Sequence, residues 1–389
     1  MQYDFTARIA RRAFGSGKWK SFPPQWEAAG AYPMDTADME FKTAPCITQA
    51  LVQAAGHGTY GYTALTPQYY NAVLRWMQTR HNWQVQKDWL LHANGVVSAL
   101  YSAVRAFTQS GDAVLIHTPV YAPFISSIVG NNRKLVQSKM LCQNGLYTLD
   151  YDDTEEKIVA ENVKLVILCS PQNPAGRVWT RDELLHLAHI CLKHNVLLVS
   201  DEIHFDFVHA PNTHTVLATL SQEIAQNCVV MTAPSKTFNL PGLHSANVFV
   251  PNEALRARMQ KQLQTDGGHG MNFFAQVATI AAYTGGADWL EALLVQLQSN
   301  YALFASFCGE HLPKAVVSPL QGTYLVWVNF GAYFNNEEDL NAAMQRAMCA
   351  VTAGSWFNEG FALHKRFNIA LPQQALLGAL QRLAQQIAR

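Results

Sequence analysis

The sequence predicts an α/β fold in which a largely parallel sheet is covered by helices on both faces. Six short apolar runs recur from about residue 88, and most of them are rich in β-branched side chains. Segments with helical periodicity separate several of the runs, as expected where the chain crosses from one parallel strand to the next. The six expected strands are 89–91, 113–116, 163–168, 196–199, 228–231 and 246–250.

The clearest helix lies between the third and the fourth of these strands. Thr180 is suited to be its N-cap, and Glu183 completes a capping box. Its apolar face consists of Leu184, Leu187, Ala188 and Cys191. In open α/β sheets, ligands bind beyond the carboxyl ends of the strands. The polar residues that follow each run are therefore the candidates for function.

The pattern changes near residue 287, where a long helix leads into a second unit. A strand, a helix and a second strand are expected there at 323–328, 337–350 and 367–370, followed by a final amphipathic helix. The sequence thus predicts a large α/β domain over 48–286 and a smaller α+β domain over 287–389. Segment 1–47 has little periodicity, and we expect it to complete the smaller domain.

The amino-acid composition indicates which broad classes of protein this chain can belong to. Hydrophobic residues make up 49% of the 389 residues and charged residues only 14%, which indicates a globular protein with much buried surface. The 28 basic and 28 acidic side chains balance without a basic block, so nucleic-acid binding has no electrostatic signal. Seven dispersed cysteines favour reduced thiols, and neither a signal peptide nor an apolar run of about 18 residues is visible. We expect a soluble, cytoplasmic protein.

Lys236 follows the fifth run, which breaks at Pro234 and delivers Ser235 and Lys236 to the end of the strand. Lysine is almost never fully buried without a partner. One interpretation is a lysine that forms a Schiff base, whose amine must be desolvated to lose its proton near neutral pH. An ordinary lysine on a loop explains this stretch equally well.

Polar residues also follow the third and fourth runs. Two prolines bracket Asn173 and fix one amide, a neutral donor suited to a phenolate oxygen, although a simple turn also explains Asn-Pro. Asp201 ends the fourth run, where a buried carboxylate needs a cation such as a pyridinium N–H. A metal held by Asp201, Glu202 and His204 is the alternative, but no second cluster at ligand spacing supports it, so we expect no metal.

The first two runs end in weaker signals. Gly95 opens a helix whose free N–H groups are suited to an anion, as in many strand-to-helix turns. Tyr121 is suited either to lie flat against a cofactor ring or to pack in the core.

Asn173-Pro174, Asp201 and Ser235-Lys236, in this order and at these spacings, resemble the fold-type I pyridoxal-phosphate enzymes of the class I/II aminotransferase superfamily. Further motifs resemble its MalY/PatB-type cystathionine β-lyase (C-S lyase) branch, in which His204 replaces the tyrosine usual in aminotransferases. These motifs lie at 37–41, 43–46, 61–62, 116–119, 169–174, 201–204 and 281–283. The resemblance implies an aspartate-aminotransferase-like large domain with a mostly parallel seven-stranded sheet.

The resemblance also implies a role for each strand-end residue around pyridoxal 5'-phosphate. Lys236 would form the Schiff base, Asp201 would pair with the pyridinium nitrogen, and Asn173 would donate to the phenolate oxygen. Tyr121 would stack on the ring, and His204 counts among the cofactor-binding candidates.

On the phosphate side, the resemblance implies that Gly95 and Val96 offer backbone N–H groups and that Ser235 adds a hydroxyl. The chain departs from the family here. Ala233 stands where relatives usually have a phosphate-binding serine, and His244 stands eight residues after the lysine, where many relatives have arginine or another polar group. We include His244 among the cofactor-binding candidates.

For the substrate, the resemblance implies that Arg366 clamps the carboxylate and that Tyr62 reaches in from the other subunit of a homodimer with shared active sites. Asp38 is a further substrate-binding candidate, and Lys236, Tyr62 and Tyr121 are the catalytic candidates. The glycine-rich approach to the arginine is altered, reading Phe-Ala-Leu-His-Lys over 361–365.

The activity implied is α,β-elimination on cystathionine or a related cysteine S-conjugate, giving a thiol such as homocysteine, pyruvate and ammonia, as in methionine biosynthesis. Two alternatives remain. An amino-acid aminotransferase would use the same residues, and a regulatory protein on an enzyme fold would explain Ala233 as a sign of decay.

Overall fold

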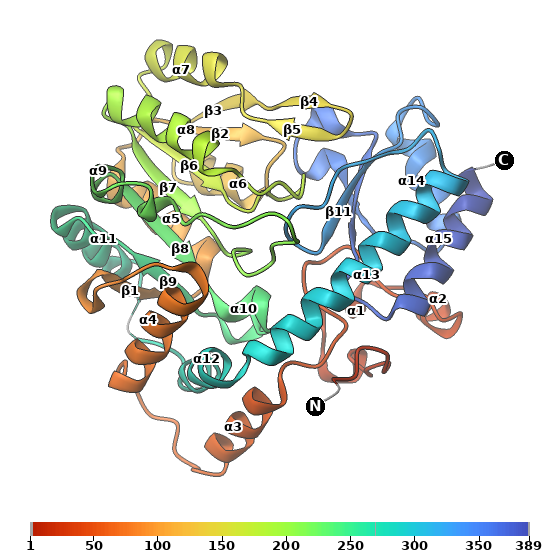
Figure 1. Cartoon of the computed structure of the whole chain (residues 1–389), viewed down its shortest axis with the longest axis horizontal. Coiled ribbons are helices and arrows are strands. Elements are labelled where there is room, and N and C mark those ends of the chain that lie inside the picture. Colours follow the sequence, from red (N-terminus) through yellow and green to blue (C-terminus); the bar gives the residue numbers. More distant parts are fainter. Residues whose placement is uncertain (1–2, 269, 388–389) are drawn as a thin grey trace.

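The computed structural model describes residues 3–268 and 270–387, and its largest sheet has seven strands in the order β1-β9-β8-β7-β6-β2-β3 (Figure 1). Strands β3, β2, β6, β7 and β8 run parallel to one another, whereas β9 pairs antiparallel with both β8 and β1. The mostly parallel seven-stranded sheet is thus confirmed. Its strands are β1 (Leu90–Ala93), β2 (Ala113–Thr118), β3 (Lys134–Lys139), β6 (Leu165–Cys169), β7 (Leu197–Asp201), β8 (Cys228–Thr232) and β9 (Ala246–Phe249).

All six predicted strands coincide with strands of this sheet, but β3 was not predicted. It lies at the edge, where only Val136 and Ser138 are buried, so its sequence lacks the continuous apolar run of a strand covered on both faces.

Helices cover both faces of the sheet, because successive side chains of its strands point in opposite directions. Val114 and Ile116 of β2 belong to one apolar cluster, which contains α5 (Val96–Phe107), α6 (Pro123–Val129) and α11 (Glu253–Thr265). Leu115 belongs to the other cluster, together with α8 (Arg181–Lys193). The predicted capping box of α8 is confirmed: Thr180 Oγ1 accepts from Glu183 N at 3.2 Å, and Glu183 Oε2 accepts from Thr180 N at 2.8 Å.

The C-terminal part contains a four-stranded sheet in the order β10-β11-β13-β12, reached through the long helix α13 (Ala287–His311) (Figure 1). Its other elements are β10 (Val316–Val317), β11 (Leu325–Asn329), α14 (Glu337–Arg346), β12 (Thr352–Ala353), β13 (His364–Asn368) and α15 (Gln373–Ile387). The bounds of all three predicted elements differ, and β11 begins two residues after its predicted start. Helix α14 ends four residues early because Met348 adopts a left-handed backbone, and β13 begins three residues before the predicted start.

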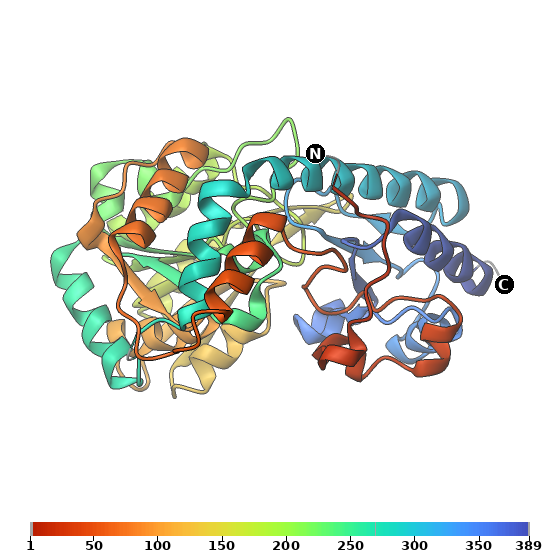
Figure 2. The same cartoon turned by 90° about the horizontal axis from the view of Figure 1, so that it is seen from below.

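The N-terminal segment runs along this C-terminal part (Figure 2). Met34 pairs with Val351 in an isolated bridge, and the Asn368 N–H donates to Met34 O at 2.9 Å. These contacts agree with the expected role of segment 1–47, while the domain bounds themselves remain a prediction.

The other α-helices and a two-stranded hairpin complete the structure. They are α1 (Gly17–Lys20), α2 (Pro24–Ala28), α3 (Pro45–Ala55), α4 (Pro67–His81), α7 (Tyr151–Ala160), α9 (Gln222–Gln226), α10 (Pro234–Thr237) and α12 (Phe273–Gly285), with the hairpin β4 (Leu141–Gln143) and β5 (Leu146–Thr148). None of the helices in the described residues is long and apolar enough to cross a membrane.

Candidate active site

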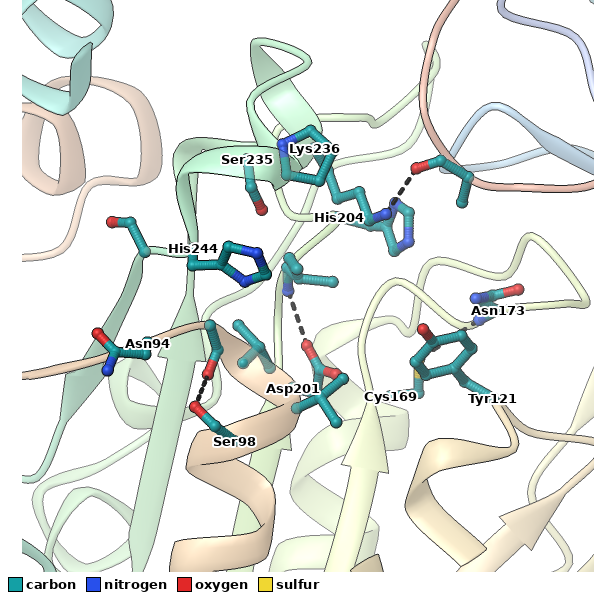
Figure 3. Close-up of a pocket in the computed structure, with 17 residues that line it drawn as sticks. Asn94, Ser98, Tyr121, Cys169, Asn173, Asp201, His204, Ser235, Lys236 and His244 are labelled. Atoms are coloured by element: carbon teal, nitrogen blue, oxygen red, sulfur yellow. Dashed lines mark hydrogen bonds between the residues drawn. The ribbon is translucent and has the colours of Figure 1, made fainter. Parts of the chain in front are cut away.

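A cavity of about 330 Å³ lies at the carboxyl ends of the central parallel strands (Figure 3). The chain beyond β6 brings Asn173 to its wall, the end of β7 brings Asp201, and α10, directly after β8, brings Lys236. Neighbouring parallel strands end at the same edge of the sheet, so Asn173, Asp201 and Lys236, which are 28 and 35 positions apart along the sequence, meet here. The expected meeting of these three residues is what the structure shows.

Lys236 is placed by the break at Pro234, which occupies the first position of α10. The Nζ atom donates a 2.5 Å hydrogen bond to the backbone carbonyl of Ala37, a residue of the N-terminal segment. Burial lowers the pKa of Lys236 to about 8, although the nearby Asp38 carboxylate acts in the opposite direction. The amine is therefore far easier to deprotonate than an exposed lysine, as a Schiff-base lysine requires.

Asp201 is a buried carboxylate without a cationic hydrogen-bond partner among the described residues. Its Oδ1 accepts only the backbone N–H of Ile203, at 3.0 Å. Burial raises the pKa of Asp201 to about 7, while the Ile203 N–H and the more distant Lys236 oppose that rise. A pyridinium N–H bound beside it would provide the missing cation.

Arg366 lies behind Asn173 and donates from NH1 to Asn173 Oδ1 at 3.1 Å. Its NH2 donates to Asp35 O at 2.6 Å and to Thr352 Oγ1 at 3.0 Å, and its guanidinium carbon lies 5.0 Å from the centre of the Phe357 ring. The side chain is buried, and within the described part of the chain no carboxylate pairs with it. Burial lowers the pKa of Arg366 to about 10, so an anionic ligand would relieve an uncompensated charge.

Asn173 keeps its amide hydrogens available because its oxygen already accepts from Arg366. The side chain points into the cavity near Tyr121 (Figure 3). It is therefore placed to donate to a phenolate oxygen, as expected.

His204 and Tyr121 supply ring surfaces to the cavity. Burial lowers the pKa of His204 well below its usual value, so the imidazole is neutral, and its Nδ1 has no hydrogen-bond partner among the described residues. The neighbouring Glu202 is engaged elsewhere, since its Oε2 lies 2.8 Å from His214 Nε2. No group of three or more His, Cys, Asp or Glu residues within 3–268 and 270–387 is arranged to hold a metal ion.

The side of the cavity that holds His244, Ser98 and Asn94 is suited to an anion (Figure 3). Gly95 adopts a φ of 104°, which a residue with a Cβ rarely adopts, and α5 begins at the next residue. The first backbone hydrogen bond of α5 runs from the Ala99 N–H to Gly95 O. The N–H groups before Ala99 are therefore available to a ligand.

Ser235, His244 and Ser245 line the cavity, and binding of the phosphate by Ser235 and of the cofactor by His244 stays a prediction. Ala233 is fully buried in the core and is absent from the cavity wall. The Ser245 hydroxyl is buried with no partner among the residues described, which makes it a cofactor-ligand candidate that the sequence analysis missed. Its only signal in the sequence is its position next to His244.

None of the three predicted substrate residues is among the residues that line this cavity, and Arg366 is joined to its wall through the hydrogen bond to Asn173. Tyr62 is fully exposed and lines an adjoining hollow that shares Asn94 and His244 with the cavity. Asp38 does not face the cavity; its carboxylate accepts from Arg11 at 2.6 and 3.0 Å. Although burial alone would raise the pKa of Asp38, the Arg11 hydrogen bond holds it below its usual value. Substrate binding by these three residues stays a prediction.

These residues fit pyridoxal 5'-phosphate, the cofactor that the resemblance implies. An uncompensated carboxylate, a helix N-terminus with hydroxyl groups and a lysine with a lowered pKa line the same cavity. The cofactor carries the complementary groups: a basic ring nitrogen, a phosphate and an aldehyde.

Residues 28–383 match the family described as aminotransferase class I and II. The chain belongs to this family. It is 36% identical to the cystathionine beta-lyase PatB of Bacillus subtilis (strain 168), over 98% of each protein. Among solved structures, cystalysin from Treponema denticola, which contains pyridoxal 5'-phosphate, is 34% identical with a TM-score of 0.94, over 100% of this chain and 99% of that one. The pyridoxal-phosphate-bound C-S lyase of Staphylococcus hominis is 29% identical with a TM-score of 0.93, over the same shares.

Proposed function

We propose that this chain is a pyridoxal-phosphate-dependent carbon–sulfur lyase that performs α,β-elimination on cystathionine or related cysteine S-conjugates. The observation that carries the proposal is the meeting of Lys236, Asp201 and Asn173 around one cavity, with the unpaired Arg366 directly behind it. The names of the Bacillus subtilis relative and of the Staphylococcus hominis structure support a lyase over an aminotransferase.

Arg366 would bind the α-carboxylate of the substrate through two parallel N–H donors, in exchange for its present contacts to neutral oxygens. Asn173 would hold the phenolate oxygen of the cofactor, and Asp201 would hold a proton on the ring nitrogen. When bound, the cofactor supplies an electron sink at the substrate's Cα.

Lys236 would act as the general base, since its Nζ is neutral in a large fraction of molecules near pH 8. It takes the proton from Cα, the Cβ–S bond breaks, and the bonding electron pair leaves on sulfur as a thiolate. The thiolate takes up a proton, and water converts the remaining three-carbon fragment to pyruvate and ammonia. With cystathionine, the released thiol would be homocysteine.

A homodimer with shared sites is part of the proposal. Tyr62 is fully exposed although aromatic, and the hollow that it lines opens onto Asn94 and His244 of the cavity. A second copy seated over that hollow would bury Tyr62 beside the partner's cavity. A cytoplasmic location is also proposed, because all seven cysteines are free thiols.

Incubation of the purified protein with cystathionine, without any 2-oxo acid, tests the reaction. We expect stoichiometric pyruvate and free thiol, and neither product from Lys236→Ala. Conversion of an added 2-oxo acid to its amino acid, without release of a thiol, would instead identify an aminotransferase. A wild-type protein that stays colourless with added cofactor would favour the regulatory alternative.

A further inference from the structure

Trp356 is a large apolar side chain at the rim of the candidate active site. It remains 43% exposed, and its ring centre lies 5.4 Å from that of Tyr121, a residue of the cavity wall. The two residues come from different parts of the molecule, because Trp356 ends a 3-10 turn (Gly354–Trp356) that follows β12 of the smaller sheet. An exposed tryptophan beside a cavity is a candidate contact for a ligand.

The turn holds Trp356 in a defined position. The Ser355 hydroxyl donates to Glu337 Oε1 at 2.7 Å, and Asn358 Nδ2 donates to Gln137 Oε1 of β3 at 2.8 Å. Gly354 packs so closely that a Cβ there would lie 1.9 Å from Phe361 O. The tryptophan is thus presented on a fixed backbone, and its exposure does not come from a loosely packed loop.

The same turn connects the rim to the carboxylate clamp. Phe357 packs edge-on against Trp356, with ring centres 5.0 Å apart, and its own ring faces the Arg366 guanidinium at 5.0 Å. An amino acid whose carboxylate is bound by Arg366 and whose Cα faces Lys236 has to extend its side chain toward the cavity opening. Trp356 lies beside Tyr121 of the cavity wall and remains part-exposed there.

The few charged groups in the cavity wall distinguish between substrates with a charged and with an apolar side chain. Apart from the histidines His204 and His244, Asp201 and Lys236 are the only acidic or basic side chains among the described lining residues, and the proposed reaction uses both for the cofactor and the proton transfer. In the described residues of this wall, no further charged group faces the opening to pair with a second amino-acid head group. Beside Tyr121, Trp356 instead offers an aromatic surface.

We propose that Trp356 is a specificity-determining residue that packs against the substituent on the substrate's sulfur and favours apolar, above all aromatic, S-substituents. This inference rests on the proposed lyase function. It predicts a lower KM for S-benzyl-cysteine than for cystathionine, because the distal end of cystathionine carries a charged amino and a charged carboxylate group.

Pyruvate release from S-methyl-cysteine, S-benzyl-cysteine and cystathionine tests the inference in the wild-type holoenzyme, Trp356→Ala and Trp356→Phe. We expect Trp356→Ala to raise KM for S-benzyl-cysteine by about tenfold, the scale of one aromatic contact, and to leave KM for S-methyl-cysteine within about twofold. Trp356→Phe should retain most of the preference. Phe14→Ala removes another exposed aromatic side chain and should change none of these values.

Equal changes of KM for the small and the aromatic substrate in Trp356→Ala would overturn the inference. Spectral titration of the bound cofactor with the same amino acids gives affinities that need no turnover. If the wild type releases no pyruvate from any substrate, the lyase function fails, and this titration still decides whether Trp356 selects the aromatic side chain.

Discussion

The Thr237 hydroxyl donates a 2.6 Å hydrogen bond to the Asp206 carboxylate. This bond joins the residue after Lys236 to the loop that follows Asp201, the last residue of β7. Asp206 is buried and also accepts from Trp76 Nε1 at 3.2 Å, while His81 Nε2 of α4 lies 2.9 Å away. One carboxylate therefore holds together the two strand ends that carry the candidate catalytic groups.

Replacing Thr237 tests this connection. Thr237→Val keeps the volume but removes a donor from a buried carboxylate, so we expect a loss of about 1–3 kcal/mol in the free energy of unfolding. We also expect kcat to fall by about tenfold, because small misplacements of a catalytic group are costly, and the pH profile of kcat to shift. Thr237→Ser keeps the hydroxyl and should restore both. If Thr237→Val and Thr237→Ser have the same kcat and the same pH profile, the hydrogen bond to Asp206 does not position the catalytic lysine.

The lowered pKa of Lys236 predicts a gain in stability when the lysine is removed. Below about pH 8, the folded and unfolded states both carry the protonated amine, so the cost of burying the charge is fully present. The cost fades as the pH rises from about 8 to 10.5, where the unfolded chain also loses its proton.

Lys236→Met should therefore stabilise the cofactor-free protein at pH 7 by about 2 kcal/mol, which combines a gain of about 3 from the pKa shift and a loss of about 1 from the bond to Ala37. Urea unfolding at pH 7 and near pH 10.5 measures the difference, which should shrink at the higher pH. The exposed Lys20→Met serves as the control. A destabilised Lys236→Met at pH 7 would contradict the burial cost.

Arg366 should act on substrate binding rather than on the cofactor. Arg366→Lys keeps the charge but loses the planar pair of donors, so we expect KM to rise by about 30- to 100-fold, the scale of a lost charged hydrogen bond. The visible absorbance of the holoenzyme should remain. Arg382→Lys on α15 changes an arginine that donates to Ala347 O and provides the matched control. Loss of cofactor binding in Arg366→Lys would argue against a substrate clamp.

Shared active sites predict complementation between two inactive variants. Lys236→Ala and Tyr62→Ala homodimers should each be inactive or strongly impaired. After mixing and subunit exchange, half of the dimers would be mixed, each with one intact site, so about a quarter of the wild-type activity should return. Size-exclusion chromatography establishes the dimer independently. No recovery in a sample with demonstrated exchange would place Tyr62 outside the partner's site.

Much of the site could be predicted because it depends on local sequence. Apolar runs make β6, β7 and β8 recognisable, and parallel strands end at one edge, so Asn173, Asp201 and Lys236 had to lie close together. The capping box of α8 is equally local, since its two partners are three residues apart.

The sequence by itself determined the sheet, its functional edge and the lysine, because strand burial and chain polarity decide these features. Only the tertiary structure decided what surrounds them: Asp38 is held by Arg11, Asp206 ties Thr237 to α4, and Trp356 lies against Tyr121. These contacts join residues 27 to 235 positions apart, or elements whose relative placement depends on the packing of two sheets. Charge pairing and burial at such distances leave no periodic pattern in the sequence, and for that reason they emerge only in the folded chain.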